Sequence, residues 1–213
     1  MLTYFIVVEQ NVVYEVDRSR SKDIPEETMS GFGGIAVVDG YPAYNGFPRQ
    51  RCWEHLRREV RDTKIEDTVT HYHELYDRAK KMKEKPPPER ERFIRKAREN
   101  EFPELIATLR EHEGNKKATE AATKIENALP DMFRGVRDPD IPLNNSHAER
   151  LLRKVVVHRK LWGCSGTRRE KGSSITRYPA WKHGSYRTRT FSKNCKNSHH
   201  RRGDLILTSK FVA

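Results

Sequence analysis

The chain has 213 residues, enough for one sizeable domain with an insertion or for two small domains. Hydrophobic residues make up 35% and charged residues 34% of it. No apolar run approaches the roughly 20 residues that a bilayer-spanning helix needs, so we expect no contact with a membrane. A formal net charge of +12 indicates a polyanionic partner such as nucleic acid, because neutralising phosphates releases counterions.

The cysteines and the amino terminus bear on the cellular compartment. Cys52, Cys164 and Cys195 are odd in number and widely spaced, which favours reduced thiols over a disulfide framework. Met1 is not followed by the basic region and apolar run of a secretory signal. We therefore expect a cytoplasmic protein, built as one domain with a helical insertion.

The first 52 residues are predicted to form strands. Residues 2–9 and 12–17 are β-branched and aromatic runs separated by Gln10 and Asn11, which is typical of a hairpin. A short helix is expected from Ile24 to Ser30. Residues 34–38 form a continuous apolar run, the pattern of a buried strand, and Asp39 would stand at its carboxyl end, where open α/β sheets place their ligand sites.

Residues 53–137 are predicted to form the helical insertion. One apolar stripe recurs at spacings of three or four, through Ile65, Val69, Tyr72, Tyr76 and Ala79. The three prolines at 86–88 should break this block. Helix is expected again around Phe93 and Ile94, and once more after Pro103 with Leu105, Ile106 and Leu109, which gives an antiparallel helical arrangement.

Residues 138–175 are predicted to begin with a rigid loop at 138–142 and to continue as a helix from about Ser146. Residues 176–213 are basic, with a single acid at Asp204, and show no periodicity until Leu205. We expect this last part to be a poorly ordered tail.

Several segments carry polar residues in a specific order. They are VDGYPAY at 38–44, QRCWEHLRR at 50–58, NNSHAERLLR at 144–153 and VHRK at 157–160. Taken singly, Asp39 before Gly40 is a common turn pair, and Ser146 with Glu149 has the spacing of a capping box. A structural role for each acidic residue is therefore an open alternative.

In combination, these segments resemble the insertion-sequence 66 family of transposases. That family carries D-G-Y-x-x-Y after a strand, then C-W-x-H-x-x-R, a helical insertion, and N-N-x-x-E-R-x-x-R followed by R-K. The resemblance covers about residues 2 to 172 and implies an α/β fold with a partial ribonuclease H-like core, a mixed sheet with helices, interrupted by the insertion. It implies that Asp39 and Glu149 are two of three catalytic carboxylates that bind Mg²⁺ or Mn²⁺, since hard cations prefer oxygen ligands.

The expected partner is double-stranded DNA at the ends of a mobile element. Residues predicted to contact its phosphates are His55, Arg57, Arg58, Arg150, Arg153, Arg159 and Lys160. A solvated basic face is the alternative for any one of these cations. Cys52 and His55 have a spacing that could begin a zinc site, but no second Cys/His pair with matching spacing follows, so we expect no zinc.

The first carboxylate of the family lies in a D-E-T segment, and no such segment precedes Leu2. From this we predict a chain shortened at its amino end and frameshifted after about Ser174, and therefore an inactive remnant of a transposase. Two alternatives stay open. The chain can be a non-catalytic basic protein that binds DNA, a full-length transposase or a second copy of itself, or it can be unstable because a strand edge is left exposed.

Overall fold

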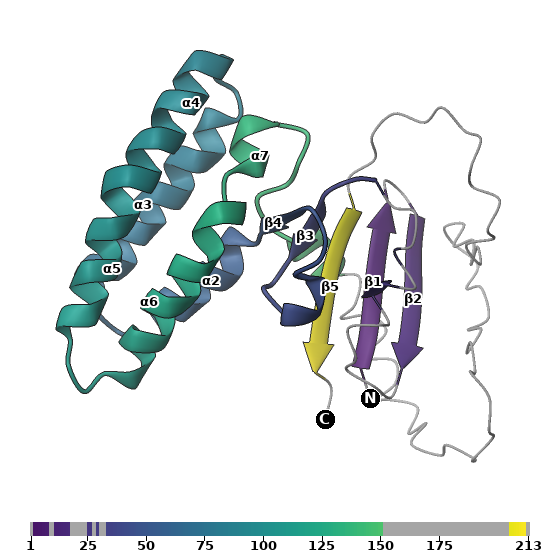
Figure 1. Ribbon diagram of the computed structural model, residues 1–213, viewed down its shortest axis with the longest axis horizontal. Helices are drawn as coiled ribbons and strands as arrows, with labels where there is room; N and C mark the ends of the chain where they lie inside the picture. Colours follow the sequence, from purple (N-terminus) through teal and green to yellow (C-terminus); the bar gives the residue numbers. More distant parts are fainter. Residues whose placement is uncertain are drawn as a thin grey trace. The chain divides into compact units, whose positions relative to one another are not determined.

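The computed structural model describes residues 2–8, 11–17, 25–26, 29, 33–150 and 205–211, with side chains for 25–26, 29 and 33–150 (Figure 1). The chain divides into two compact units. One unit comprises residues 1–36, 41–47 and 145–213, and the other, which we call the helical unit, comprises residues 37–40 and 48–144. The predicted mixed α/β class is confirmed, with helix predominating, while the ribonuclease H-like topology stays a prediction.

Three antiparallel strands belong to the first unit. Strands β1 (Leu2–Val8) and β2 (Asn11–Asp17) form the predicted hairpin, with Val8 paired to Asn11. Strand β5 (Leu205–Phe211) lies on the other side of β1, where Leu2 pairs with Phe211. The prediction of an irregular tail is therefore wrong for residues 205–211. The pairing joins the two ends of the sequence, and local patterns carry no signal for such long-range contacts.

Two short strands flank the first motif. Strand β3 (Ala36–Val38) is fully buried and is followed by Asp39, as the apolar run predicts. A 3-10 turn, η1 (Pro42–Tyr44), comes next, and then strand β4 (Arg49–Arg51), which the sequence did not predict because it is short and polar. Strands β3 and β4 are hydrogen-bonded neighbours.

The helical unit continues with α2 (Trp53–Arg61) and α3 (Glu66–Met82). The predicted stripe on α3 is confirmed for Tyr72, Tyr76 and Ala79, which are buried, whereas Ile65 and Val69 are partly buried. Helix α4 (Pro87–Lys96) begins at the proline break, since proline fits the first turn of a helix, where no amide donor is needed.

The sequence predicts a break in the helix before Pro103. The structure shows no such break. Helix α4 passes through a π-helical turn, η2 (Ala97–Glu101), directly into α5 (Phe102–Glu111). Proline lacks an amide hydrogen and its ring crowds the carbonyl one turn earlier, and a wider π turn accommodates both effects without ending the helix. The chain thus stays helical from residue 87 to residue 111.

The remaining helices are α6 (Lys116–Ala128), the 3-10 turn η3 (Leu129–Asp131) and α7 (Arg134–Arg137). Asn115 caps α6, since its side-chain oxygen accepts a hydrogen bond from the Ala118 amide at 3.2 Å. The predicted loop at 138–142 is confirmed, and the Asp138 carboxylate accepts a bond from the Asp140 amide there. A helix follows from Ser146, of which residues 146–150 are described.

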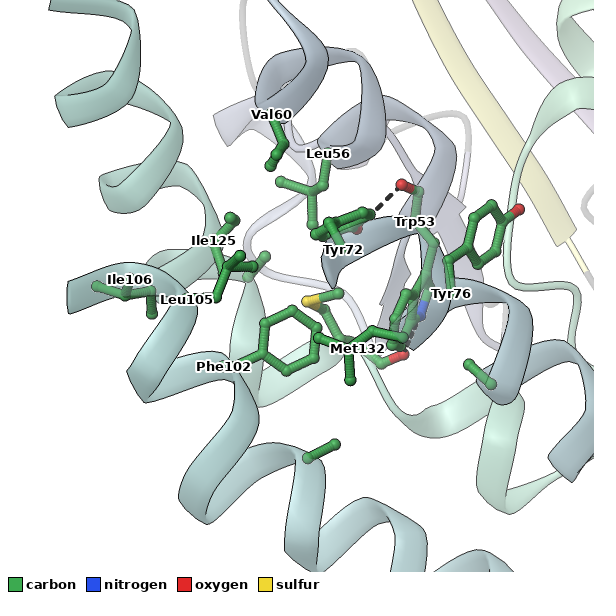
Figure 2. Close-up of a cluster of buried hydrophobic side chains, with 14 of the residues drawn as sticks. Trp53, Leu56, Val60, Tyr72, Tyr76, Phe102, Leu105, Ile106, Ile125 and Met132 are labelled. Atoms are coloured by element: carbon green, nitrogen blue, oxygen red, sulfur yellow. Dashed lines mark hydrogen bonds between the residues drawn. The ribbon is translucent and has the colours of Figure 1, made fainter. Parts of the chain in front are cut away.

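The core of the helical unit is centred on Trp53, which is fully buried (Figure 2). Its ring stacks on Tyr76 at a centroid distance of 5.7 Å and meets Phe102 and Phe133 edge-on. Trp53 is the first residue of α2, and it shares one buried cluster with the apolar stripes of α3 and α5. No helix in the described ranges is long and apolar enough to cross a bilayer.

Candidate functional site

Backbone hydrogen bonds connect two of the sequence segments that stood out with each other and with the residue that precedes a third. The amide of Cys52 donates to the carbonyl of Val38 at 2.9 Å, which ties the second segment to the strand that ends before Asp39. The next amide, that of Trp53, donates to the carbonyl of Leu143 at 2.9 Å. Val38 and Leu143, more than a hundred positions apart in the sequence, are therefore joined through a dipeptide. The second segment thus lies between the strand that ends before Asp39 and the residue that precedes Asn144.

Asp39 occupies the turn that leaves β3. It is partly exposed, and Gly40 after it has a φ of 108°, in the region that side chains other than glycine rarely adopt. The turn interpretation of the Asp-Gly pair is thus supported. It does not compete with a ligand role, because the turn keeps the carboxylate at the end of a buried strand.

Glu149 lies in the first turn of the helix that starts at Ser146. Its amide donates to the carbonyl of Asn145 at 3.1 Å, so Asn145 is the N-cap residue. Ser146 is therefore not the N-cap residue, and Glu149 stands at the fourth position of the helix and not at the third, as a capping box requires. The side chain of Glu149 is partly exposed.

The preceding asparagine anchors the start of this segment in the helical unit. The Asn144 side chain donates to the Tyr76 hydroxyl at 2.9 Å. Burial raises the pKa of Tyr76 to about 12, although the bond from Asn144 acts against that rise. Tyr76 therefore stays a neutral phenol at physiological pH, and it serves as an anchor rather than as a base.

The described residues do not form a complete metal site. No group of three or more His, Cys, Asp or Glu side chains within the described part of the chain is arranged to hold a metal ion. In addition, the charge of Asp39 acts on the guanidinium of Arg51, so the carboxylate already has a cation in its surroundings. These residues alone do not fit a metal centre, and the predicted role of Mg²⁺ or Mn²⁺ stays a prediction.

The predicted phosphate-binding cations differ in what surrounds them. His55, Arg57 and Arg58 lie on α2 and are partly exposed. Glu54 accepts two hydrogen bonds from Arg57, at 2.6 and 2.9 Å, and lies 3.6 Å from Arg58. The bond from Arg57 lowers the pKa of Glu54. The charge of Arg57 is thus largely compensated within its own helix, which weakens its case as a DNA contact.

The other predicted cations can be followed only in part. Arg150 is exposed on the first turn of its helix. Arg153, Arg159 and Lys160 lie outside the described residues, as does the basic stretch up to residue 204.

Sequence reasoning missed the residues of β4. The buried Gln50 side chain donates to the Met132 carbonyl at 2.6 Å and accepts from the Gly135 amide at 2.7 Å, so it fastens this strand to the end of the helical unit. Arg51 is 8% exposed. Burial lowers the pKa of Arg51, and the charge of Arg49 acts in the same direction, while Asp39 opposes them. The alternation of charged and neutral residues in RQR at 49–51 is the pattern in the sequence that could have indicated this strand.

Comparison with known proteins agrees with the arrangement of these segments. Residues 4–172 match the family described as "Transposase IS66 family". A relative named "Uncharacterized protein y4qI", from Sinorhizobium fredii, is 34% identical over 67 residues, which cover 25% of this chain and 12% of that protein. The chain therefore aligns with only a small part of that relative. No solved structure matches the chain.

Proposed function

Because this chain belongs to the IS66 family of transposases, we propose that it descends from an enzyme of DNA transposition. In this proposal, Asp39 and Glu149 are two of the metal-binding carboxylates of a ribonuclease H-like domain. The observation that carries the proposal is the family match over residues 4–172, which contains both acidic residues in their expected order. The hydrogen bond from the Cys52 amide to the Val38 carbonyl supports it, since it joins the second motif to the strand that ends before Asp39.

The chemistry of transposition explains why carboxylates are expected at these positions. Two divalent ions, held by several carboxylate oxygens, activate the attacking oxygen and stabilise the leaving oxygen during cleavage at a phosphate. Asp39 stands at the carboxyl end of a buried strand and Glu149 in the first turn of a helix. Both positions belong to the ends of regular elements, which place a metal ligand more precisely than loops do.

A polypeptide of these 213 residues is proposed to bind metal weakly and not to cleave DNA. It contains no D-E-T segment, so one of the three carboxylates of the family has no counterpart in it. A cluster that lacks one ligand holds its ions weakly and in the wrong place. The cation beside Asp39 adds to this effect, because a guanidinium repels a second positive charge.

Double-stranded DNA is the proposed partner, together with a full-length transposase or a second copy of the chain, in the cytoplasm. The net charge of +12 favours a second candidate function, in which the chain binds DNA without any chemistry. Such binding would be salt-sensitive and indifferent to base sequence, and it would not require Asp39 or Glu149.

One experiment on the purified chain tests DNA binding and DNA cleavage together. Supercoiled plasmid is incubated with the protein and Mg²⁺ or Mn²⁺, and nicking is measured beside Asp39→Ala and Glu149→Ala. We expect DNA binding but no nicking by any of the three proteins. Nicking that disappears in both variants would overturn the proposed inactivity. Absence of DNA binding at low salt would contradict the proposed function itself.

A further inference from the structure

Strand β4 presents its residues alternately to two sides. Successive side chains of a strand point in opposite directions, so Gln50 faces one way and Arg49 and Arg51 face the other. The bonds of Gln50 to Met132 and Gly135 show that its side is fastened to the helical unit. Two arginines are thereby held on the opposite side of a short, well-anchored strand.

The guanidinium of Arg51 lies directly against the backbone of Gly40. A Cβ atom placed on Gly40 would lie 2.5 Å from the Arg51 Cζ atom and still closer to Nη2. No side chain larger than hydrogen is compatible with this contact. Glycine at position 40 therefore allows the positive φ of the turn, and it also leaves the space that the guanidinium fills.

The Nε atom of Arg51 is buried, and among the described residues none accepts a hydrogen bond from it. A buried cationic donor without an acceptor is strongly unfavourable, so such groups in proteins are as a rule satisfied by an ion or a ligand. The unsatisfied Nε atom of Arg51 is thus an observation that points to a further acceptor beside the charges of Asp39 and Asp131.

The charged residues that the structure describes around Arg51 do not provide an acceptor for its Nε atom. Arg49 is bonded to Asp131 at 2.8 Å, and Arg134 lies 3.6 Å from the same carboxylate. Asp131 is thus shared between two other arginines. Asp39 and Asp131 both attract the Arg51 guanidinium. Within the part of the chain that the structure describes, these two carboxylates are shared among Arg49, Arg51 and Arg134.

We propose that Arg51, lying on the backbone of Gly40, binds a phosphate group of DNA next to Asp39. A guanidinium carries several donors in a planar fork that matches the oxygens of a phosphate, and the 8% of Arg51 that is exposed leaves part of this fork open to one. The proposal rests on the proposed function, because that function makes DNA the ligand. It adds a contact at the carboxylate where the strand to be cut would be held.

The test compares the binding of the full chain to a fluorescent duplex with that of Arg51→Gln and Arg51→Lys, by anisotropy between about 50 and about 200 mM salt. Arg51→Gln should raise Kd by about 3- to 10-fold and lower the salt slope by about one. Arg51→Lys should keep the slope but raise Kd, because lysine lacks the planar fork. If Arg51→Gln does not fold, which circular dichroism would show, Arg51→Lys carries the test.

The matched control is Arg61→Gln, which removes one exposed charge from α2, where Arg61 pairs with Asp62. A Kd and slope for the Arg51 variants equal to those of this control would overturn the proposal. A second comparison asks whether Arg51 acts through Asp39 alone. In an Asp39→Asn background, Arg51→Gln should still weaken binding, and loss of its effect there would also overturn the proposal. If the unmodified chain does not bind DNA at all, the proposed function fails instead.

Discussion

The indole Nε1–H of Trp53 donates a hydrogen bond to the carbonyl of Met132 at 2.8 Å, across 79 positions of sequence. The same carbonyl accepts a bond from the Gln50 side chain. One carbonyl at the end of the helical unit thus holds both β4 and the start of α2. The segment at residues 50–58 therefore holds several parts of the helical unit together. We expect substitutions of its buried residues to lower the stability of the fold.

Trp53→Phe is expected to lower the free energy of unfolding by about 2 to 3 kcal/mol. It removes one buried hydrogen bond and leaves a cavity among Tyr76, Phe102 and Phe133. Urea denaturation followed by circular dichroism measures the change. Tyr72→Phe is the control, because it removes only the hydroxyl that donates to the Trp53 carbonyl at 3.1 Å, with an expected loss of about 1 kcal/mol (Figure 2). Equal losses of unfolding free energy in the two variants would show that the Trp53 ring contributes no more than a single hydrogen bond, which contradicts this prediction.

Gln50→Leu is expected to lower the free energy of unfolding by about 2 kcal/mol or more. It preserves the approximate size of the side chain but leaves the buried amide of Gly135 without its acceptor. Thermal unfolding of the variant and of Gln50→Glu provides the check. Glu at this position keeps an acceptor for Gly135, but it loses the donor to Met132 and buries a charge. The Gln50→Glu variant should therefore be less stable than Gln50→Leu at neutral pH.

Glu101 should contribute stability that depends on pH. Burial alone would raise its pKa, but the hydrogen bond and charge of Arg78, with help from Lys96, outweigh burial and hold the pKa below 4.5. Since the folded pKa is depressed, the contribution is complete above the unfolded pKa, at about pH 4.3. It is lost as pH falls through the folded pKa.

The measurement is the difference in unfolding free energy between the unmodified chain and Glu101→Gln from pH 7 to pH 3. We expect about 1 kcal/mol near neutrality, because Arg78 is 39% exposed and solvent weakens the pair. The difference should shrink towards zero at the acid end. A difference that does not change with pH would show that the Arg78–Glu101 bonds are not its source.

Gly40→Ala is expected to destabilise the chain by about 1 to 3 kcal/mol, through the positive φ and through displacement of the Arg51 guanidinium. Gly46→Ala serves as the comparison, since an added Cβ meets nothing within 4 Å there. That change should be neutral or slightly stabilising. Differential scanning calorimetry of both variants tests the expectation, and equal melting temperatures would refute it.

The local elements of the fold were largely predictable. The hairpin of β1 and β2 follows from β-branched and aromatic runs, the buried strand before Asp39 from a continuous apolar run, and the apolar stripe of α3 from spacings of three or four. The proline at position 103 misled the prediction, because sequence does not show that a π turn can absorb it. Strand β5 was missed because its partner, β1, lies at the opposite end of the sequence.

The places of Asp39 and Glu149 in the secondary structure were predictable, but their surroundings were not. Asp39 and Glu149 follow from ordered motifs, and their positions after a strand and at a helix start agree with the sequence. The pairing of Arg57 with Glu54 and the burial of Arg51 do not follow from local patterns, because each depends on side-chain packing. The number of cations in the sequence motifs therefore overestimates the number that can bind DNA, because some are paired with carboxylates in the fold.

The central claim, that Asp39 and Glu149 are metal ligands, is tested most directly by metal-directed cleavage of the polypeptide itself. Ferrous ion binds oxygen sites at least as tightly as Mn²⁺, and with ascorbate and peroxide it generates radicals that cut the nearby backbone. We predict cuts beside residue 39 and beside residue 149, suppressed by excess Mg²⁺ and absent in Asp39→Ala. Cuts elsewhere only, or a pattern that Asp39→Ala leaves unchanged, would contradict the account.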